Sequence, residues 1–467
     1  MECGANDAAL VDLALGPVPE DLPNSEMAEQ IELPAGWRIR RLGELIARPQ
    51  YGLTASAMDD LSGPRFLRIT DIQKSGVDWT TVPSCDCDKA TLERLKLLPG
   101  DVVVARIGAT TGKAHLIRDR VDAVFASYLI RLRANDGLEP EFLECFTNSA
   151  AYWRQIDAVK GGRLKQGVNI PLLESLELAL PPLPEQRAIA CVLRTVQKAK
   201  EACERVLAAT RQLKQSLLQH LFTYGPVPFP QAAYVPLKET EAGPMPEHWS
   251  AVSIREIETF MQYGTSSRCE SGGSGLPVLR IPNVVGGRID TGDLKYLAAS
   301  AVEIERHLLQ RGDLLFVRTN GVRENVGRCA VYLGSPVRSL FASYLIRARL
   351  APDRALPEFV QLFTETNTGR ASFTGRASGA ADGKFNINTQ TIRSTILPLP
   401  PLSEQREIVA QVSVVEAKLA AEESRHAALA ALFQSLLHHL MTGQVRVPFD
   451  CGGSDAALAS RGARSRT

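Results

Sequence analysis

The chain has 467 residues, of which 45% are hydrophobic and 22% charged, with 53 basic and 52 acidic side chains. These proportions are ordinary for a globular protein with sizeable cores, and the length is typical of about three domains. No apolar run approaches the roughly 18 residues that a membrane span needs, and the scattered cysteines indicate cytoplasmic thiols rather than a disulfide framework. The composition therefore excludes a secreted, membrane or fibrous protein.

The charge is distributed unevenly along the chain. The first 33 residues carry eight acidic side chains and neither Lys nor Arg, which predicts a flexible acidic extension over 1–33. The rest of the chain holds 53 basic and 44 acidic side chains, a net charge of +9 that is compatible with a polyanionic partner. A second flexible tail is expected over 444–467, where Cys-Gly-Gly-Ser and Arg-Gly-Ala-Arg-Ser-Arg occur.

Most of the remaining chain is an internal repeat with an offset of 212 to 219 residues. Phe-Ala-Ser-Tyr-Leu-Ile-Arg occurs unchanged at 125–131 and at 341–347. Leu-Pro-Pro-Leu-Pro-Glu-Gln-Arg at 180–187 corresponds to Leu-Pro-Pro-Leu-Ser-Glu-Gln-Arg at 399–406. A period this long indicates a duplicated domain rather than a solenoid.

The first part of each copy, over 34–180 and 246–399, mixes strand and short helix patterns. β-Branched and aromatic runs at 101–106 and 125–133 are set off by Gly and Pro, as strands are, and a short helical pattern follows at 140–146. The second copy repeats these signals. We therefore expect two similar mixed α/β domains, of the α+β class, in which the Trp at the start of each copy is a core anchor.

The second part of each copy, over 181–224 and 400–443, predicts a long helix. Apolar residues recur at alternating steps of three and four over about four to five heptads, which is the seam of a coiled coil. We expect the two helices to pair as an antiparallel coiled coil with pseudo-two-fold symmetry. The second seam is weaker at Glu422 and His426, which are alternatively a solvent-facing patch. A Pro-rich linker over 225–245 is expected to be extended and stiff.

Catalytic motifs are incomplete in this chain. The stretch from Gly108 to Lys113 is one residue short of a P-loop, and Cys85-Asp-Cys87 has no second pair at zinc spacing. The sequence contains no Gly-x-Ser-x-Gly elbow, no His-Glu-x-x-His, and no Asn-Pro-Pro-Tyr or Asp-Pro-Pro-Tyr. The sequence therefore predicts no catalytic residue and no metal site.

The two copies differ in two loop regions that are rich in Arg, Lys, Asn and Gln. These side chains make bidentate hydrogen bonds to guanine and adenine edges, so different loops on one scaffold predict two different DNA half-sites. Arg pairs at 131/133 and 347/349 alternate along strands and either contact phosphate or form a salt-bridged sheet face. The candidate DNA-binding residues are Arg106, Thr110, Thr111, Lys113, Arg163, Lys165, Gln166, Asn169, Arg318, Asn320, Arg323, Asn325, Arg328, Arg376, Lys384, Asn386 and Asn388.

From Leu33 to about Gly443, the order of these elements resembles the DNA-specificity subunit of type I restriction–modification systems. The resemblance rests on two α/β domains, each followed by Pro-Pro-Leu-x-Glu-Gln-Arg and a long helix. It implies that each domain reads one half of a bipartite, asymmetric site in double-stranded DNA. It also implies that the helices set the spacing and dock two methyltransferase subunits, which endonuclease/translocase subunits join. S-adenosylmethionine and ATP/Mg²⁺ are then cofactors of those partners, and this chain has none.

The helix starts supply candidates for the contact with the methyltransferase: Glu185, Gln186, Arg187, Glu404, Gln405 and Arg406. Favourable acidic first turns of two helices account for these residues equally well. Two other functions stay open at this point. One is a self-contained DNA-modifying enzyme with an unrecognised motif, and the other is a coiled-coil protein scaffold that does not bind DNA.

Overall fold

The computed structural model describes residues 33–59, 63–73, 76–160, 167–379 and 383–448. The chain divides into two compact units, each of which is described by itself. Unit 1 runs to Glu204 and resumes at Arg425, and unit 2 comprises Arg205–Ser424. Among the described residues, no helix is long and apolar enough to cross a membrane.

Unit 1 is built on a four-stranded antiparallel sheet in the order β2-β9-β6-β7. Its central strand β6 is buried along its whole length, as its Val-Val-Val run predicts. The strands of unit 1 are β1 (Arg38–Arg41), β2 (Gln50–Tyr51), β3 (Arg65–Leu67), β4 (Ile72–Gln73), β5 (Gly76–Val77), β6 (Asp101–Ala105), β7 (Ala114–Leu116), β8 (Ala123–Phe125), β9 (Leu129–Arg133) and β10 (Glu177–Leu180). Its short helices are α1 (Lys89–Leu95), α2 (Pro140–Asn148), α3 (Ala150–Lys160) and α4 (Ile170–Ser175).

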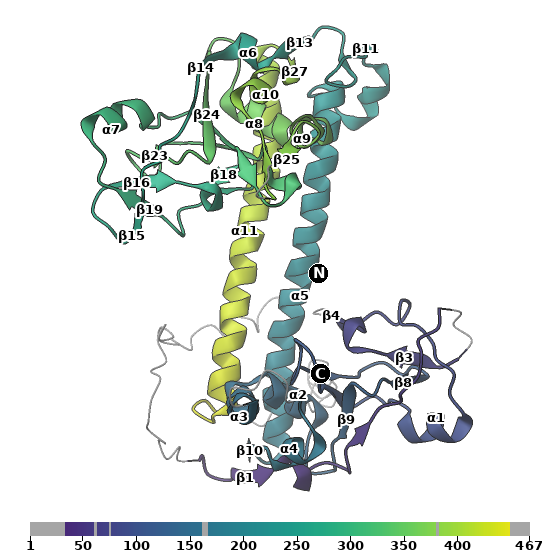
Figure 1. Cartoon of the computed structure of the whole chain (residues 1–467). Helices are drawn as coiled ribbons and strands as arrows, with labels where there is room; N and C mark the ends of the chain where they lie inside the picture. The colour runs from purple at the N-terminus through teal and green to yellow at the C-terminus, as the bar shows by residue number, and fades with distance from the viewer. Residues whose placement is uncertain (1–32, 60–62, 74–75, 161–166, 380–382, 449–467) are drawn as a thin grey trace, which may run out of the picture. The chain divides into compact units, whose positions relative to one another are not determined.

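Unit 2 repeats this sheet as β14-β24-β20-β22 and adds the four-stranded sheet β15-β19-β16-β23 (Figure 1). Its strands are β11 (Leu237–Lys238), β12 (Met245–Pro246), β13 (Ser250–Ser253), β14 (Glu258–Tyr263), β15 (Glu270–Ser271), β16 (Leu276–Leu279), β17 (Val284–Val285), β18 (Arg288–Ile289), β19 (Lys295–Leu297), β20 (Leu314–Val317), β21 (Thr319–Asn320), β22 (Cys329–Val331), β23 (Leu340–Phe341), β24 (Leu345–Leu350), β25 (Ser378–Gly379), β26 (Phe385–Asn386) and β27 (Ile396–Leu399). Its short helices are α6 (Ile254–Ile257), α7 (Ala301–His307), α8 (Pro357–Glu365), α9 (Asn367–Thr374) and α10 (Thr389–Arg393).

The single strand predicted over 125–133 is wrong, because the chain changes sheets inside this motif. β8 pairs in parallel with β3, whereas β9 pairs with β6 and β2 in the other sheet. Between them, the Leu129 N–H donates to the Ala126 carbonyl at 2.9 Å and closes a turn. The same turn separates β23 from β24, where the Leu345 N–H donates to the Ala342 carbonyl at 2.9 Å. The identical heptapeptide thus encodes a sheet-to-sheet turn in both copies.

Two long helices, α5 (Leu183–Tyr224) and α11 (Leu402–Met441), contribute a segment of each to both units. Within each unit, the two segments run antiparallel (Figure 1). Their contacts show this, since residues with higher numbers in α5 contact residues with lower numbers in α11. The contacts are Lys200–Phe433 and Glu204–His426 in unit 1, and Arg211–Glu423 and Lys214–Glu416 in unit 2. The solvent-facing alternative is wrong for Glu422, which is only 5% exposed and is paired with Lys418.

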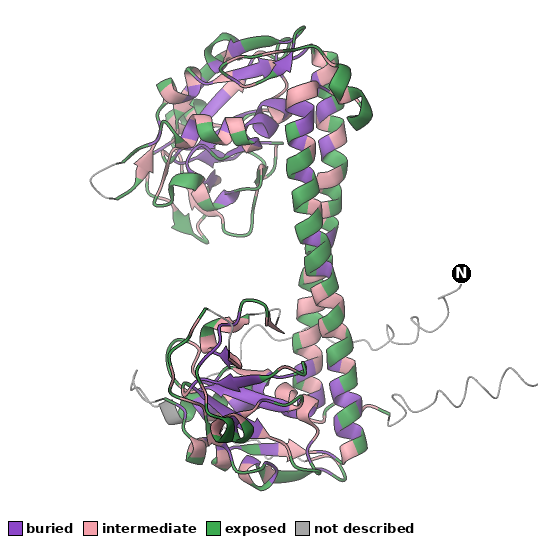
Figure 2. Cartoon of the chain, turned by 90° about the vertical axis from the view of Figure 1, so that its right-hand side faces the viewer, coloured by how far each residue is buried: buried purple, intermediate pink, exposed green. Residues whose placement is uncertain are grey.

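Each unit contains one end of α5 and one end of α11, because residues from both ends belong to its hydrophobic core (Figure 2). The core of unit 1 contains Ile189 and Leu193 from the start of α5, together with Leu437 and Leu440 from the end of α11. The core of unit 2 mirrors this arrangement with the start of α11 and the end of α5. Each α/β domain therefore packs on its own helix and on the far end of the other.

The two segments predicted to be irregular are partly ordered. The linker over 225–245 contains a 3-10 helix, Phe229–Tyr234, and the strand β11, which pairs with β12. The tail predicted from 444 begins in the core, because Val445 and Val447 pack against unit 1 and Arg446 binds the Glu185 carboxylate. Residues 1–32 of the predicted acidic extension and the tail from 449 lie outside the described residues.

Candidate nucleic-acid interface

The carboxyl end of the central strand carries the same arginine in both units. Arg106 directly follows β6, and Arg318 directly follows β20. Each guanidinium carbon lies 4.8 Å from the centroid of a tyrosine ring, that of Tyr51 in unit 1 and that of Tyr263 in unit 2. At this distance, the cation is attracted to the face of the aromatic ring, so each tyrosine fixes the position of its arginine.

Each of these tyrosines also holds the short helix that follows the variable loops. The Tyr51 hydroxyl accepts a hydrogen bond from the Ile170 N–H at 3.3 Å, and the Tyr263 hydroxyl accepts one from the Thr389 N–H at 3.3 Å. The donors are the first residues of α4 and α10, whose N–H groups have no partner inside the helix. The tyrosine thus joins the arginine, the sheet end and the helix start.

In unit 1, the loop after Arg106 presents an exposed lysine. Lys113 is exposed, and its carbonyl accepts a hydrogen bond from the Ala105 N–H at 2.8 Å, which fixes the loop to β6. The Thr111 hydroxyl donates to the Gly108 carbonyl at 2.6 Å and stabilises the turn, and Thr110 is half-buried. The candidates Arg163, Lys165 and Gln166 lie outside the described residues.

In unit 2, a small sheet joins the two candidate loops. β21 pairs with β26, and β26 pairs with β25, so that Asn320 lies opposite Phe385 and Thr319 opposite Asn386. The Arg323 guanidinium lies 5.8 Å from the Phe385 ring centroid. The structure therefore brings Asn320, Arg323 and Asn386 together, as expected if the loops form one surface.

The other candidates of unit 2 have different surroundings. Asn325 donates to the Asn320 side-chain oxygen at 3.4 Å, so these two amides share a hydrogen bond within the loop. Arg376 donates to the carbonyl and hydroxyl of Ser394, both at 3.1 Å. Arg328 and Lys384 are exposed.

Asn169 and Asn388 have an evident structural role as helix caps. The Asn169 side-chain oxygen accepts from the Leu172 N–H at 3.0 Å, and that of Asn388 accepts from the Thr391 N–H at 2.8 Å. An asparagine at this position typically stabilises a helix by about 1 kcal/mol. The acceptor of each amide is therefore committed to its helix, while both residues remain exposed beside the loops.

The structure contradicts part of the predicted partner-binding set, because several members are buried at the domain–helix junction. Glu185 is 0% exposed and accepts the Trp37 indole N–H at 3.0 Å. Gln186 accepts the Glu139 N–H at 2.8 Å and donates to the Gly137 and Pro181 carbonyls. The same roles recur in unit 2, where Glu404 accepts the Trp249 indole N–H at 2.9 Å and Gln405 is 0% exposed. Arg187 and Arg406 are exposed.

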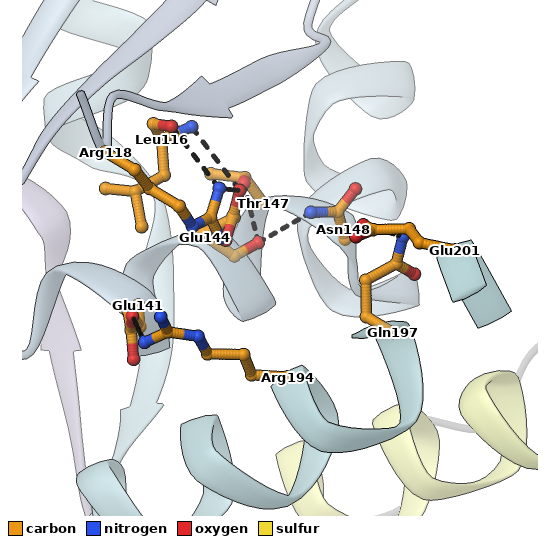
Figure 3. Close-up of polar contacts among 9 residues, drawn as sticks. All are labelled: Leu116, Arg118, Glu141, Glu144, Thr147, Asn148, Arg194, Gln197 and Glu201. Carbon is orange, nitrogen blue, oxygen red and sulfur yellow. Dashed lines mark hydrogen bonds and ion pairs between the residues drawn. The ribbon is translucent and has the colours of Figure 1, made fainter. Parts of the chain in front are cut away.

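Ion pairs add to this junction in unit 1. Arg187 and Arg194 on α5 pair with Glu139 and Glu141 at the start of α2, and Figure 3 shows the Arg194 side chain reaching Glu141. Glu144 on the same helix binds Arg118 beyond β7 and thereby connects the helix to the sheet (Figure 3). The second copy has Leu356 at the position of Glu139, so the first of these pairs has no counterpart there.

The strand arginines form a salt-bridged sheet face, which was one of the two alternatives. Arg133 donates twice to Asp101, at 2.6 and 2.8 Å, and Arg349 donates twice to Asp313, at 2.7 and 3.0 Å. Both aspartates are buried, and Arg131 and Arg347 are 7% and 3% exposed. Arg131 and Arg347 are therefore buried in the sheet, whereas Arg133 and Arg349 stay partly exposed while they pair with the aspartates.

The described residues contain no group of three or more His, Cys, Asp or Glu side chains arranged to hold a metal ion. Burial raises the pKa of the Cys85 thiol to about 11, so that thiol is protonated at neutral pH.

The sequence-based prediction did not include the tyrosines that contact Arg106 and Arg318, although the repeat contained a signal for them. Tyr51 and Tyr263 are each followed by Gly and are separated by the same 212 residues as the two arginines. A Cβ at either glycine would lie 2.2 Å from a backbone carbonyl oxygen, so glycine is required at this strand crossing. Tyr128 and Tyr344 occupy the middle of the identical heptapeptide and are 53% and 56% exposed.

The known proteins that are similar to this chain in sequence are specificity subunits of type I restriction enzymes. A family model described as the type I restriction modification DNA specificity domain matches residues 63–208. The specificity subunit of the type I restriction enzyme EcoKI from Escherichia coli K12 is 29% identical over 360 residues, which are 74% of each chain. The putative type I restriction enzyme MjaX specificity subunit from Methanocaldococcus jannaschii is 23% identical over 434 residues, covering 91% of this chain and 97% of that protein.

Solved structures share the fold. The type I restriction–modification S subunit from M. genitalium superposes with a TM-score of 0.52 at 15% identity, covering 86% of this chain and 96% of that one. A chain from a structure describing complex assembly and conformational transition of the type I system gives a TM-score of 0.50 at 21% identity, covering 89% and 100%. With the specificity domain and the relatives above, these findings show that the chain is similar to the DNA-specificity subunits of type I restriction–modification systems.

Proposed function

We propose that each α/β domain reads one half of a bipartite, asymmetric DNA site on behalf of a type I restriction–modification complex. The observation that carries this proposal is the sheet end at Arg106 and Arg318. There the two copies share one framework but present loops of different length and composition, 107–112 against 319–327. A shared framework holds both domains on DNA in the same way, and different polar loops meet different base edges.

In this proposal, the long helices set the spacing between the two DNA half-sites. α5 has 42 residues, so at a rise of 1.5 Å per residue it is about 63 Å long, which exceeds one turn of B-DNA, about 34 Å. We propose that the exposed helix surface, including Arg187 and Arg406, docks two methyltransferase subunits, which endonuclease/translocase subunits then join. The buried Glu185, Gln186 and Gln405 contribute to that surface indirectly, because they fix each domain on its helix.

The chemistry of methylation and cleavage resides in the partners in this proposal. S-adenosylmethionine and ATP/Mg²⁺ are bound by them, and this chain supplies recognition and assembly in the cytoplasm. The rival function, a self-contained modifying enzyme, predicts methyl transfer by the purified chain with S-adenosylmethionine and DNA. The other rival, a protein scaffold, predicts complexes whose assembly and activity do not depend on DNA sequence.

A domain exchange tests the proposal directly. Residues 246–399 are replaced by the corresponding segment of another family member, and the chain is coexpressed with its methyltransferase. The modified sequence is expected to change in one half and to keep the other half and the gap. A change in both halves by a folded chimera, or methyl transfer by this chain alone, contradicts the proposal.

A further inference from the structure

Three exposed or half-buried side chains recur at one place in both units, although the loops beside them differ. In unit 1 they are Tyr51, Arg106 and Tyr128, and in unit 2 they are Tyr263, Arg318 and Tyr344. The backbone N–H of the arginine donates to the backbone carbonyl of Tyr128 in unit 1 and of Tyr344 in unit 2, both at 2.9 Å. We call each set the Tyr-Arg-Tyr frame. Its tyrosines are 39% and 53% exposed in unit 1, and 37% and 56% exposed in unit 2.

A fourth position extends each frame with a positive charge. The Ala105 N–H donates to the Lys113 carbonyl at 2.8 Å, and in the same way the Val317 N–H donates to the Arg328 carbonyl at 2.8 Å. Lys113 and Arg328 are therefore structurally equivalent, and both are exposed. The variable loops 107–112 and 319–327 lie between the shared arginine and the shared cation.

We infer that the two Tyr-Arg-Tyr frames, with Lys113 and Arg328, are matching phosphate clamps that bind the DNA backbone whatever its sequence. This inference rests on the proposed function. It assigns base reading to the variable loops and binding of the DNA backbone to the shared residues. If the two domains read different half-sites, side chains identical in both cannot supply the difference. Shared side chains at the edge of a reading loop suit the one ligand that both half-sites have in common, which is the sugar-phosphate backbone.

The chemistry of the frame fits an anion. The Tyr51 and Tyr263 hydroxyl oxygens each accept a backbone N–H, so each hydroxyl proton is free to be donated to a phosphate oxygen. A guanidinium presents several N–H donors in a fixed plane. Among the described residues of unit 2, one donor of Arg318 binds the Ser343 carbonyl at 3.3 Å, and the others are left for a ligand. Within the described part of unit 1, the Nε atom of Arg106 is buried and has no hydrogen-bond partner. The tyrosine face holds this guanidinium in place where a polar partner is missing.

The test uses the full chain assembled with its methyltransferase and two DNA duplexes, one with the recognised sequence and one with it scrambled. Binding of both is measured over a range of salt concentrations for Arg106→Gln, Arg106→Lys and Tyr51→Phe. Arg120→Gln is the matched control, because Arg120 is exposed beyond the opposite end of β6. Thr111→Ala represents the variable loop.

Arg106→Gln is expected to weaken binding of both duplexes by the same factor, about tenfold, and to lower the salt slope by about one. Arg106→Lys keeps the positive charge and is expected to keep most of the salt dependence. Tyr51→Phe is expected to weaken the binding of both duplexes slightly. Arg120→Gln is expected to change neither the affinity nor its salt dependence. Thr111→Ala is expected to act on the recognised duplex alone. The inference is overturned if Arg106→Gln, with an unchanged melting temperature, alters the ratio of the two affinities or leaves both unchanged. Failure of the proposed function itself gives a different result, because the unaltered complex would then bind the recognised and the scrambled duplex equally well.

Discussion

Replacing Gln186 by Leu removes one buried amide that joins domain 1 to helix α5. The side chain is 1% exposed, and its three hydrogen bonds all go to backbone groups. It accepts from the Glu139 N–H at 2.8 Å and donates to the Gly137 and Pro181 carbonyls at 3.1 and 2.9 Å. Leucine has a similar volume and offers no donor or acceptor, so all three backbone groups lose this partner.

The expected loss of stability is large for a single substitution. The Pro181 carbonyl is buried and costs about 1–3 kcal/mol when it is left without a partner, whereas water can reach the exposed Gly137 and the half-buried Glu139. Whole domains are stable by about 5–15 kcal/mol, so the loss is a substantial fraction of the total. Gln186→Glu is expected to do no better at neutral pH, because a carboxylate accepts the N–H but cannot donate to the two carbonyls.

Hydrogen exchange of the intact chain locates the effect. In Gln186→Leu, amides of α2 and of the start of α5 are expected to exchange about tenfold faster, while unit 2 is unchanged. Gln405→Leu is the matched variant, since Gln405 makes the equivalent bonds to Leu356, Arg354 and Pro400 and should affect unit 2 instead. Lys198→Ala, on the exposed face of α5, is the control. The reasoning is refuted if Gln186→Leu exchanges like the control or opens both units equally.

Three further predictions concern stability, pH and DNA binding. Lys214 is 8% exposed and donates to Glu365 and Glu416 at 2.6 and 2.7 Å. Lys214→Ala leaves Glu365 without this cation, while Glu416 keeps its ion pair with Arg288 at 3.3 Å, so the substitution is expected to cost unit 2 about 3 kcal/mol in urea unfolding. Burial lowers the pKa of His115 from 6.5 to about 4, so the unfolded state binds this proton more readily than the native state. Unit 1 should therefore lose up to about 3 kcal/mol as the pH falls from about 6.5 to about 4, and His115→Phe should remove this component. Lys113→Ala is expected to weaken binding of the assembled complex to DNA and to lower the salt slope by about one.

Each of these expectations has a clear contrary result. A Lys214→Ala chain as stable as the unaltered one would mean that the Glu365 carboxylate does not need this cation. Identical pH profiles for His115→Phe and the unaltered chain would show that this imidazole titrates normally in the native state. DNA binding by Lys113→Ala that matches the unaltered complex at every salt concentration would remove the lysine from the interface.

Much of the architecture could be predicted because the sequence contains an internal repeat, so that each pattern occurs in two copies. Trp37 and Trp249 are core anchors, at 5% and 1% exposed, as their repeated position suggested. The heptad spacing predicted both long helices, because apolar residues that recur every three and four positions over four to five heptads indicate a helix. The sheet change inside 125–133 was not visible, because the residues on both sides of the turn have equally strong strand propensity.

The site was predicted less well, and the reasons are physical. Polarity alone does not distinguish a surface residue from a buried one whose hydrogen bonds are satisfied, so Gln186 and Gln405 resembled partner contacts. Asn169 is a good base-reading residue type and an equally good helix cap. Tyr51 and Tyr263 are not among the predicted residues, because that prediction rested on the loops that differ between the copies, whereas these tyrosines are shared.

The most direct test of the central claim is a genome-wide map of modified adenines in cells that express the methyltransferase, with and without this chain. The account predicts a motif that depends on the chain and consists of two short, unlike blocks separated by a fixed gap. The absence of any motif that depends on the chain, or a single uninterrupted block, would contradict it.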